Sequence, residues 1–144
     1  VQGQVVELVR VALNGKQNAT SQVLATTLRQ IKKDAPAVKM IVSYADRNQN
    51  HIGIIYQATN WLYLGEYASE RGVILNGKLI HRRSINSKYG TSTLSWLKEN
   101  VDKNAKVIKG KTKIKYVFPL DKWTRKKVIN RAKPFPKKST KLVI

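Results

Sequence analysis

Residues 5–44 follow the order strand, loop, helix, strand, and this order constrains the fold more than any other feature. The β-branched run at 5–13 predicts a strand. A helix is expected at 20–33, capped by Thr20 or the serine after it, because apolar residues recur there with helical spacing. The nearly continuous apolar run at 38–44 is typical of a buried parallel strand. We therefore expect a βαβ unit with a right-handed crossover.

Shorter elements are expected in the rest of the chain. They are a helix at 52–59, a strand at 61–67, a hairpin that turns at Asn76-Gly77, a helix at 92–101, a strand at 113–118 and a basic helix from 121 to 133. This pattern predicts an α/β or α+β fold with a mixed sheet and flanking helices. We expect one domain over 1–133, divided into a core at 1–72 and a basic part at 73–133, and a loosely held tail at 134–144.

Positive charge is concentrated in the second half of the chain. The 144 residues include 28 Lys and Arg but 8 Asp and Glu, and residues 73–144 hold 20 of the basic residues and 3 of the acidic ones. Such a surface attracts polyanions, and nucleic acid is the leading candidate. An anionic membrane is a weaker one, because no basic helix has a strong apolar face. No helix-turn-helix, zinc-finger or RNP signature supports sequence-specific reading of a groove.

Several classes of protein are excluded or weakened by what the sequence lacks. There is no cysteine, so the chain has no disulfide framework, no thiolate zinc site and no cysteine nucleophile. Two histidines among scattered acids make a weak metal signature, and we expect no metal site. No apolar run approaches the ~20 residues that span a bilayer, and no signal peptide is evident.

Three polar segments are candidates for chemistry. The loop at 14–21 precedes a helix, and the first N–H groups of a helix can bind a phosphate. The alternative is an ordinary βα loop that binds no ligand. The segment 43–46 ends a buried strand with a serine, a tyrosine and an aspartate, where ligands of open sheets bind; a core tyrosine and a loop-starting aspartate remain the alternative. The segment 56–63 interleaves aromatics and amides, which suits either an extruded base or a sheet core.

The order of elements in 5–67 resembles the second half of the GNAT acetyltransferase superfamily. In that fold a glycine-containing loop binds the pyrophosphate of coenzyme A. The equivalent here is Lys16-x-x-Ala19-x-Ser21, which lacks both glycines. The resemblance implies acetyl-CoA as donor and a binding site made of Val11, Leu13, Lys16, Ala19, Thr20 and Ser21.

A second, closer resemblance is to the Mom family of phage DNA-modification proteins. It covers most of 5–136 and is carried by ELVR, SYAD at 43–46, QNHIG at 49–53, YQATNWLY at 56–63, RRS, KYG and KYVF. The family is GNAT-like and converts the exocyclic amine of adenine to an acetamido (methylcarbamoyl) form, which protects phage DNA from host restriction. Similarity to this family implies activity in the host bacterial cytoplasm, with double-stranded DNA and an acyl-CoA donor as partners.

The resemblance centres this activity on the segment 43–61, and the chemistry of the side chains gives the expected roles. Catalysis is expected at Ser43, Tyr44, Asp46, His51 and Tyr56. Base binding is expected at Gln57, Asn60, Trp61 and Tyr63. For contacts with DNA, the basic half offers Arg82, Arg83, Lys88, Lys113, Lys115, Tyr116, Arg125 and Lys126. Members of the family carry further N-terminal strands, which we expect as another segment or a separate chain that completes the sheet.

Two other functions stay open at this stage. A GNAT-like acetyltransferase of RNA or protein would use the same core. A non-catalytic basic DNA-binding protein would use the core as a scaffold, and would not need the polar groups of 43–46 and 56–60 to converge on one pocket.

Overall fold

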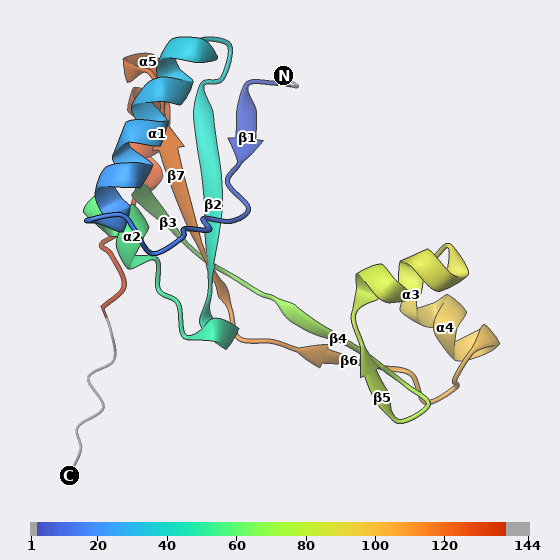
Figure 1. The fold of residues 1–144 in the computed structure, drawn as a ribbon. Coiled ribbons are helices and arrows are strands. Elements are labelled where there is room, and N and C mark those ends of the chain that lie inside the picture. Colours follow the sequence, from blue (N-terminus) through green and yellow to red (C-terminus); the bar gives the residue numbers. More distant parts are fainter. Residues whose placement is uncertain (1–2, 138–144) are drawn as a thin grey trace. The chain divides into compact units, whose positions relative to one another are not determined.

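The structure, a computed structural model, describes residues 3–137, which fold as two units (Figure 1). The second unit is the segment 68–112, and the first unit is formed by the residues on either side of it. The strands are β1 (Val5–Glu7), β2 (Met40–Asp46), β3 (Leu62–Tyr67), β4 (Glu70–Leu75), β5 (Lys78–Ile80), β6 (Lys106–Lys109) and β7 (Lys113–Pro119). The helices are α1 (Thr20–Asp34), α2 (Ile54–Ala58), α3 (Arg82–Tyr89), α4 (Leu94–Asn100) and α5 (Lys122–Val128), with 3₁₀ helices η1 (Arg47–Gln49) and η2 (Ile129–Arg131).

The first unit contains a mixed sheet in the order β1-β2-β7-β3. β1 pairs with β2 in parallel, and β7 lies antiparallel to both β2 and β3. Because α1 connects the two parallel strands, β1, α1 and β2 form the predicted βαβ unit. The predicted mixed α+β class is confirmed.

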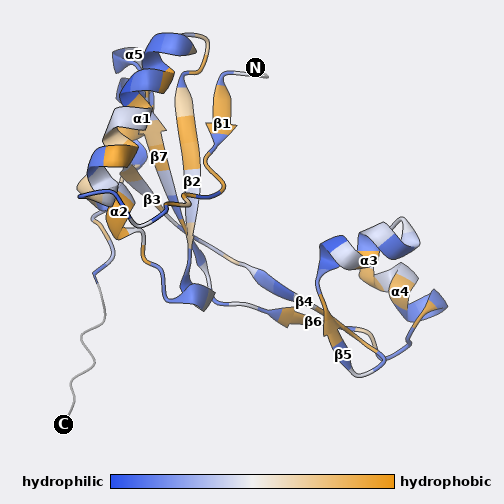
Figure 2. Cartoon of the chain, in the orientation of Figure 1, coloured by the Kyte–Doolittle hydropathy of each residue, from blue (hydrophilic) through white to orange (hydrophobic). Residues whose placement is uncertain are grey.

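The core of the first unit lies between α1, α2 and one face of this sheet. Side chains alternate along β2, so that Ile41, Ser43 and Ala45 point to the same buried face. Leu24 and Leu28, one helical turn apart on α1, pack against that face. Each such leucine contributes roughly 1.5–3 kcal/mol through burial. Figure 2 shows the hydrophobic character of β2 and the mixed surface of α1.

β1 is shorter than the predicted strand at 5–13. Leu8 N still donates to Val42 O at 2.8 Å, but the Leu8 carbonyl accepts a hydrogen bond from the Ser43 side chain at 2.7 Å instead of extending the ladder. Val9 is then 83% exposed. The β-branched pattern therefore continues beyond Leu8, but the backbone pairing of β1 with β2 ends there.

The second unit has its own sheet, in the order β5-β4-β6, and its own core. The predicted hairpin is confirmed: Asn76 and Gly77 join β4 to β5 with φ of 48° and 75°, as a type I′ turn requires. Helix α3 and strand β6 were not predicted from the sequence pattern. α3 buries only Ile85 among its eight residues, so its apolar pattern is too sparse to detect.

The C-terminal part of the first unit differs in two ways from expectation. The basic helix predicted at 121–133 is divided into α5 and η2. The part of the predicted loose tail that the structure describes, 134–137, contacts the sheet: the Phe135 ring lies 6.4 Å from that of Tyr116, and Pro136 O accepts a hydrogen bond from Gln57. The rest of that tail, 138–144, lies outside the described residues.

The hairpin of the second unit is expected to lose stability in acid through Asp102. Its carboxylate accepts from the backbone N–H of Asn76 at 2.8 Å and of Asn104 at 2.9 Å, and these bonds lower its pKa below the ordinary value of 3.8. A lowered folded pKa means that this contribution is complete above the ordinary value and is lost as the pH falls through the folded one. The amide ¹⁵N shifts of the two asparagines should titrate together at that lower pH. A midpoint at the ordinary value, or the same titration in Asp102→Asn, would contradict this.

Candidate active site

A cavity of about 510 Å³ lies where the end of β2, the start of α2 and the segment before α1 meet, and we call it the β2–α2 cavity. Its volume is in the range of small-molecule sites, roughly 300–1,000 Å³. It brings together three of the predicted cofactor-binding residues and three of the predicted catalytic ones. These are Val11, Leu13 and Thr20, and Tyr44, His51 and Tyr56.

A buried pair of hydroxyl groups joins Tyr56, which lines the cavity, to Ser43, which does not. Ser43 on β2 is 1% exposed, and its Oγ lies 2.7 Å from Tyr56 Oη on α2 and 2.7 Å from Leu8 O. A serine has one hydroxyl proton, and a carbonyl can only accept. Ser43 therefore donates to Leu8, and Tyr56 donates to Ser43. This leaves the lone pairs of the Tyr56 hydroxyl as acceptors for a ligand.

Asp46 and His51 bracket the turn between β2 and α2. The backbone N–H of His51 donates to Asp46 O at 3.2 Å, which closes the loop that contains η1. The His51 side chain is exposed and lines the cavity, as an acid/base group accessible to substrate must. Asp46 is half-buried, and it is not among the residues that line the cavity.

Gly53 was not predicted as a site residue, although it lines the cavity directly before α2. Its φ is +80°, and a Cβ built there would lie 2.3 Å from Cε2 of Tyr116 and 2.9 Å from Cδ2 of Tyr56. A glycine directly before a predicted helix is the sequence feature that could have identified this position. The other residues that line the cavity and were not predicted are Ala45, Asn50, Ile52, Ile54 and Ile55.

Gln57 and Tyr116 form a buried polar contact behind the cavity. Tyr116 is fully buried and donates its hydroxyl to Ile52 O at 2.6 Å, and Gln57 Nε2 donates to Tyr116 Oη at 3.0 Å. Burial raises the pKa of Tyr116. The prediction that Tyr116 contacts DNA is therefore wrong. The amide of Gln57, predicted to bind a base, is used to hold the tyrosine and the tail.

The predicted base-binding residues do not gather in the β2–α2 cavity. Trp61 is 1% exposed, and its ring packs between Tyr56 at 4.9 Å and Phe118 at 5.6 Å. An extruded base cannot stack on a face that is already covered, so the sheet-core alternative holds for this residue. Asn60 is exposed and lines another cavity together with Trp61, whereas Tyr63 is half-buried on β3.

The start of α1 also differs from the sequence prediction. The N-cap is Ala19, not Thr20 or Ser21, and no side chain caps the helix. The first N–H groups of α1 therefore have no side-chain acceptor. Of the predicted pyrophosphate loop, Thr20 lines the cavity, whereas Lys16, Ala19 and Ser21 do not.

The predicted DNA-contacting residues are distributed over both units. Arg82 forms an ion pair with Glu70 and donates to Ser92 O, so its partly exposed guanidinium is held by contacts within the second unit. Lys115 is half-buried, with its Nζ 5.4 Å from the centre of the Tyr67 ring. The exposed ones are Arg83 and Lys88 on α3, Lys113 on β7, and Arg125 and Lys126 on α5.

The described part of the chain has neither a metal-binding cluster nor a membrane-spanning helix. Residues 3–137 contain no group of three or more His, Asp or Glu side chains that could hold a metal ion. No helix within the same range is long and apolar enough to cross a membrane.

Comparison with known proteins places the chain in a family. The model of the Mom protein family matches residues 1–137, and the chain belongs to that family. The chain is 27% identical over 125 residues to the methylcarbamoylase mom of Escherichia phage Mu. The matched region covers 84% of this chain and 51% of the relative, so the chain spans about half the length of the curated relative that it matches. The predicted Mom family is thereby confirmed.

Proposed function

We propose that this chain carries the reaction centre of a Mom-type enzyme, which adds an acetamido (methylcarbamoyl) group to the exocyclic amine of adenine in phage DNA. One observation carries the proposal: the β2–α2 cavity is lined both by residues expected at the acyl donor and by residues expected in catalysis. A scaffold without catalytic activity has no need for this convergence. The homologous methylcarbamoylase of phage Mu indicates the reaction.

The cavity suits an acyl-CoA donor in a GNAT-like arrangement. The N–H groups at the start of α1 lack a side-chain cap, and they and Thr20 would hold a pyrophosphate at the positive end of the helix dipole. Val11 and Leu13 offer apolar contact to the pantetheine arm. When bound, the donor would supply the two carbons of the acetamido group and leave as the free thiol, and the nitrogen of the group would come from a separate nitrogen-donating co-substrate.

The proposed roles of the side chains concern the adenine amine. Tyr56 Oη has its proton directed to Ser43 and accepts a hydrogen bond from the N–H of the amine, which orients it. His51 is the proposed proton acceptor, because it lines the cavity and imidazole exchanges protons near neutral pH. Tyr44, 39% exposed at the same wall, is the proposed contact to the base.

Binding of DNA is proposed to rest on charge. The net charge of +20 favours a polyanion, and the exposed basic side chains on α3, α5 and β7 would contact phosphates. An adenine flipped out of the duplex would then reach the cavity. Unstacking it costs a few kcal/mol, and contacts between the protein and the DNA backbone would offset this cost.

Mass spectrometry of DNA nucleosides tests the proposal. The protein is expressed from its complete natural reading frame in a bacterium, and the plasmid DNA is digested to nucleosides. We expect a deoxyadenosine that is heavier by one methylcarbamoyl group, and we expect it to disappear in His51→Ala. Unmodified adenine in the presence of folded, DNA-binding protein would refute the proposal. Label from acetyl-CoA that enters only RNA or protein would also refute it, in favour of an acetyltransferase of those substrates.

A further inference from the structure

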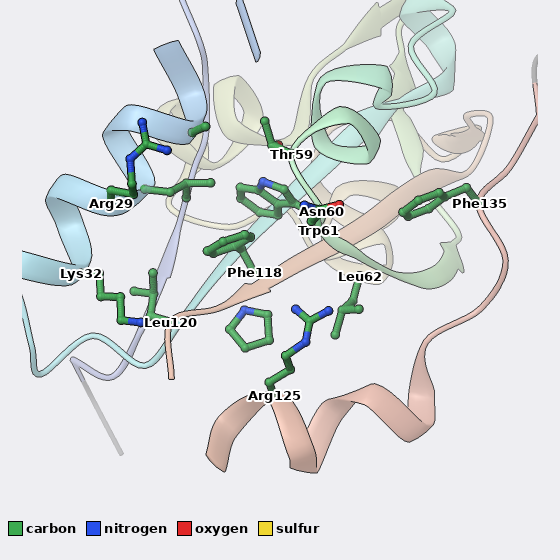
Figure 3. Close-up of a pocket in the computed structure, with 13 residues that line it drawn as sticks. Arg29, Lys32, Thr59, Asn60, Trp61, Leu62, Phe118, Leu120, Arg125 and Phe135 are labelled. Atoms are coloured by element: carbon green, nitrogen blue, oxygen red, sulfur yellow. The ribbon is translucent and has the colours of Figure 1, made fainter. Parts of the chain in front are cut away.

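A second cavity, of about 630 Å³, lies between α1 and α5 in the first unit, and we call it the α1–α5 cavity (Figure 3). It shares no lining residue with the β2–α2 cavity. Its walls come from the C-terminal half of α1, the start of β3, the end of β7, α5 and Phe135. Of its lining residues, the function proposed above uses Arg125 alone, as a contact to DNA phosphates.

Three basic side chains line this cavity, and no acidic one does among the described residues. Arg29 and Lys32 extend from α1, and Arg125 extends from α5. Figure 3 shows Trp61 and Phe118 between the side chains of Arg29 and Arg125. Arg29 Nη2 donates to Thr26 Oγ1 at 3.0 Å, which leaves its other N–H groups for a ligand. Cations gathered on two helices repel one another unless an anion lies between them.

One of the residues that line the cavity, Trp61, carries an unused hydrogen-bond donor. Trp61 is 1% exposed, and its Nε1–H is buried without a hydrogen-bond partner. An indole N–H is a donor only, so its partner has to be an acceptor atom. A buried donor without a partner costs free energy, which a ligand with a suitably placed acceptor would recover. Phe118 and Leu62 line the same cavity and provide apolar contact.

We propose that the α1–α5 cavity binds a nucleotide. Its phosphate lies against Arg29, Lys32 and Arg125, because guanidinium groups bind phosphate oxygens through paired N–H donors. Its base contacts Phe118 and accepts a hydrogen bond from Trp61 Nε1, and the exposed amide of Asn60 is at the same opening. A volume of 630 Å³ admits a nucleotide. The proposal rests on this cavity and not on the reaction proposed for the other one.

Fluorescence of Trp61 tests the proposal directly. The chain has 3 tryptophans, so replacing the other two, Trp96→Phe and Trp123→Phe, leaves Trp61 as the reporter. We expect a saturable change in emission with dAMP. Affinity should fall about tenfold for deoxyadenosine, which lacks the phosphate, and by a similar factor for dAMP in Arg29→Ala and Arg125→Ala. The control Lys98→Ala removes an exposed lysine of α4 and should change nothing.

The outcomes separate the two sources of a nucleotide and the two proposals. Binding of an adenine oligonucleotide that is much tighter than that of dAMP assigns the cavity to a DNA strand, and equal affinities assign it to a free nucleotide. No saturable change, or affinities unaffected by loss of either arginine, would overturn the inference even if adenine in DNA is modified. If dAMP still binds to a protein that does not modify adenine in DNA, the nucleotide site is supported and the proposed reaction is not.

Discussion

Tyr56→Phe is expected to reduce adenine modification by about 10²-fold, the usual cost when a reacting group loses its positioning. The substitution removes the hydroxyl that lies 2.7 Å from Ser43 Oγ and is proposed to orient the adenine amine. The phenyl ring remains and keeps its packing against Trp61 and Tyr116. Stability should therefore fall by only about 1 kcal/mol, the net value of one hydrogen bond.

The measurement combines nucleoside mass spectrometry with urea unfolding. Tyr67→Phe is the matched control, because it removes a tyrosine hydroxyl that is 48% exposed and outside the β2–α2 cavity. It should leave modification unchanged. Dependence on donor concentration adds a second readout, since loss of a group that acts on the amine lowers kcat and leaves KM for the donor near its original value. Tyr56→Phe with the activity of the parent would remove the hydroxyl from the site.

The sequence predicted those parts of the fold that depend on neighbours along the chain. The hairpin at Asn76-Gly77 follows from two residues that tolerate positive φ, and α1 follows from its own apolar spacing. The end of β1 could not be predicted, because it depends on Ser43, 35 positions further along, which bonds the Leu8 carbonyl. The β-branched sequence pattern continues past Leu8, but the hydrogen bond from Ser43 to the Leu8 carbonyl ends the pairing of β1 with β2.

The same distinction applies to the candidate site. Tyr44 and His51 flank one short loop, so their proximity in the β2–α2 cavity follows from chain connectivity and the polar segment that begins at Ser43. Within the segment 56–63, however, Tyr56 faces the cavity while Trp61 turns into the core. Residue types do not distinguish these two positions. Tertiary packing distinguishes them, because the Trp61 ring lies between the rings of Tyr56 and Phe118.

Gly53→Ala is expected to destabilise the first unit by roughly 2–6 kcal/mol, from backbone strain and overpacking together. The new Cβ would lie 2.3 Å from Cε2 of Tyr116, a contact that requires one of the two to move. Tyr116 cannot move freely, because it is fully buried and its hydroxyl donates to Ile52 O. The backbone before α2 would have to shift instead, and with it the position of Tyr56 in the cavity wall.

Gly15→Ala separates the two causes. Gly15 has a φ of +78°, nearly the +80° of Gly53, but nothing lies within 4 Å of a Cβ built there. Its substitution therefore measures strain alone, ~1–2 kcal/mol. Urea unfolding of both variants should show the larger loss of stability for Gly53→Ala, and this variant should also lose adenine modification. Equal losses of stability would mean that the contact with Tyr116 relaxes freely, and that the wall of the β2–α2 cavity is not held rigid by this tyrosine.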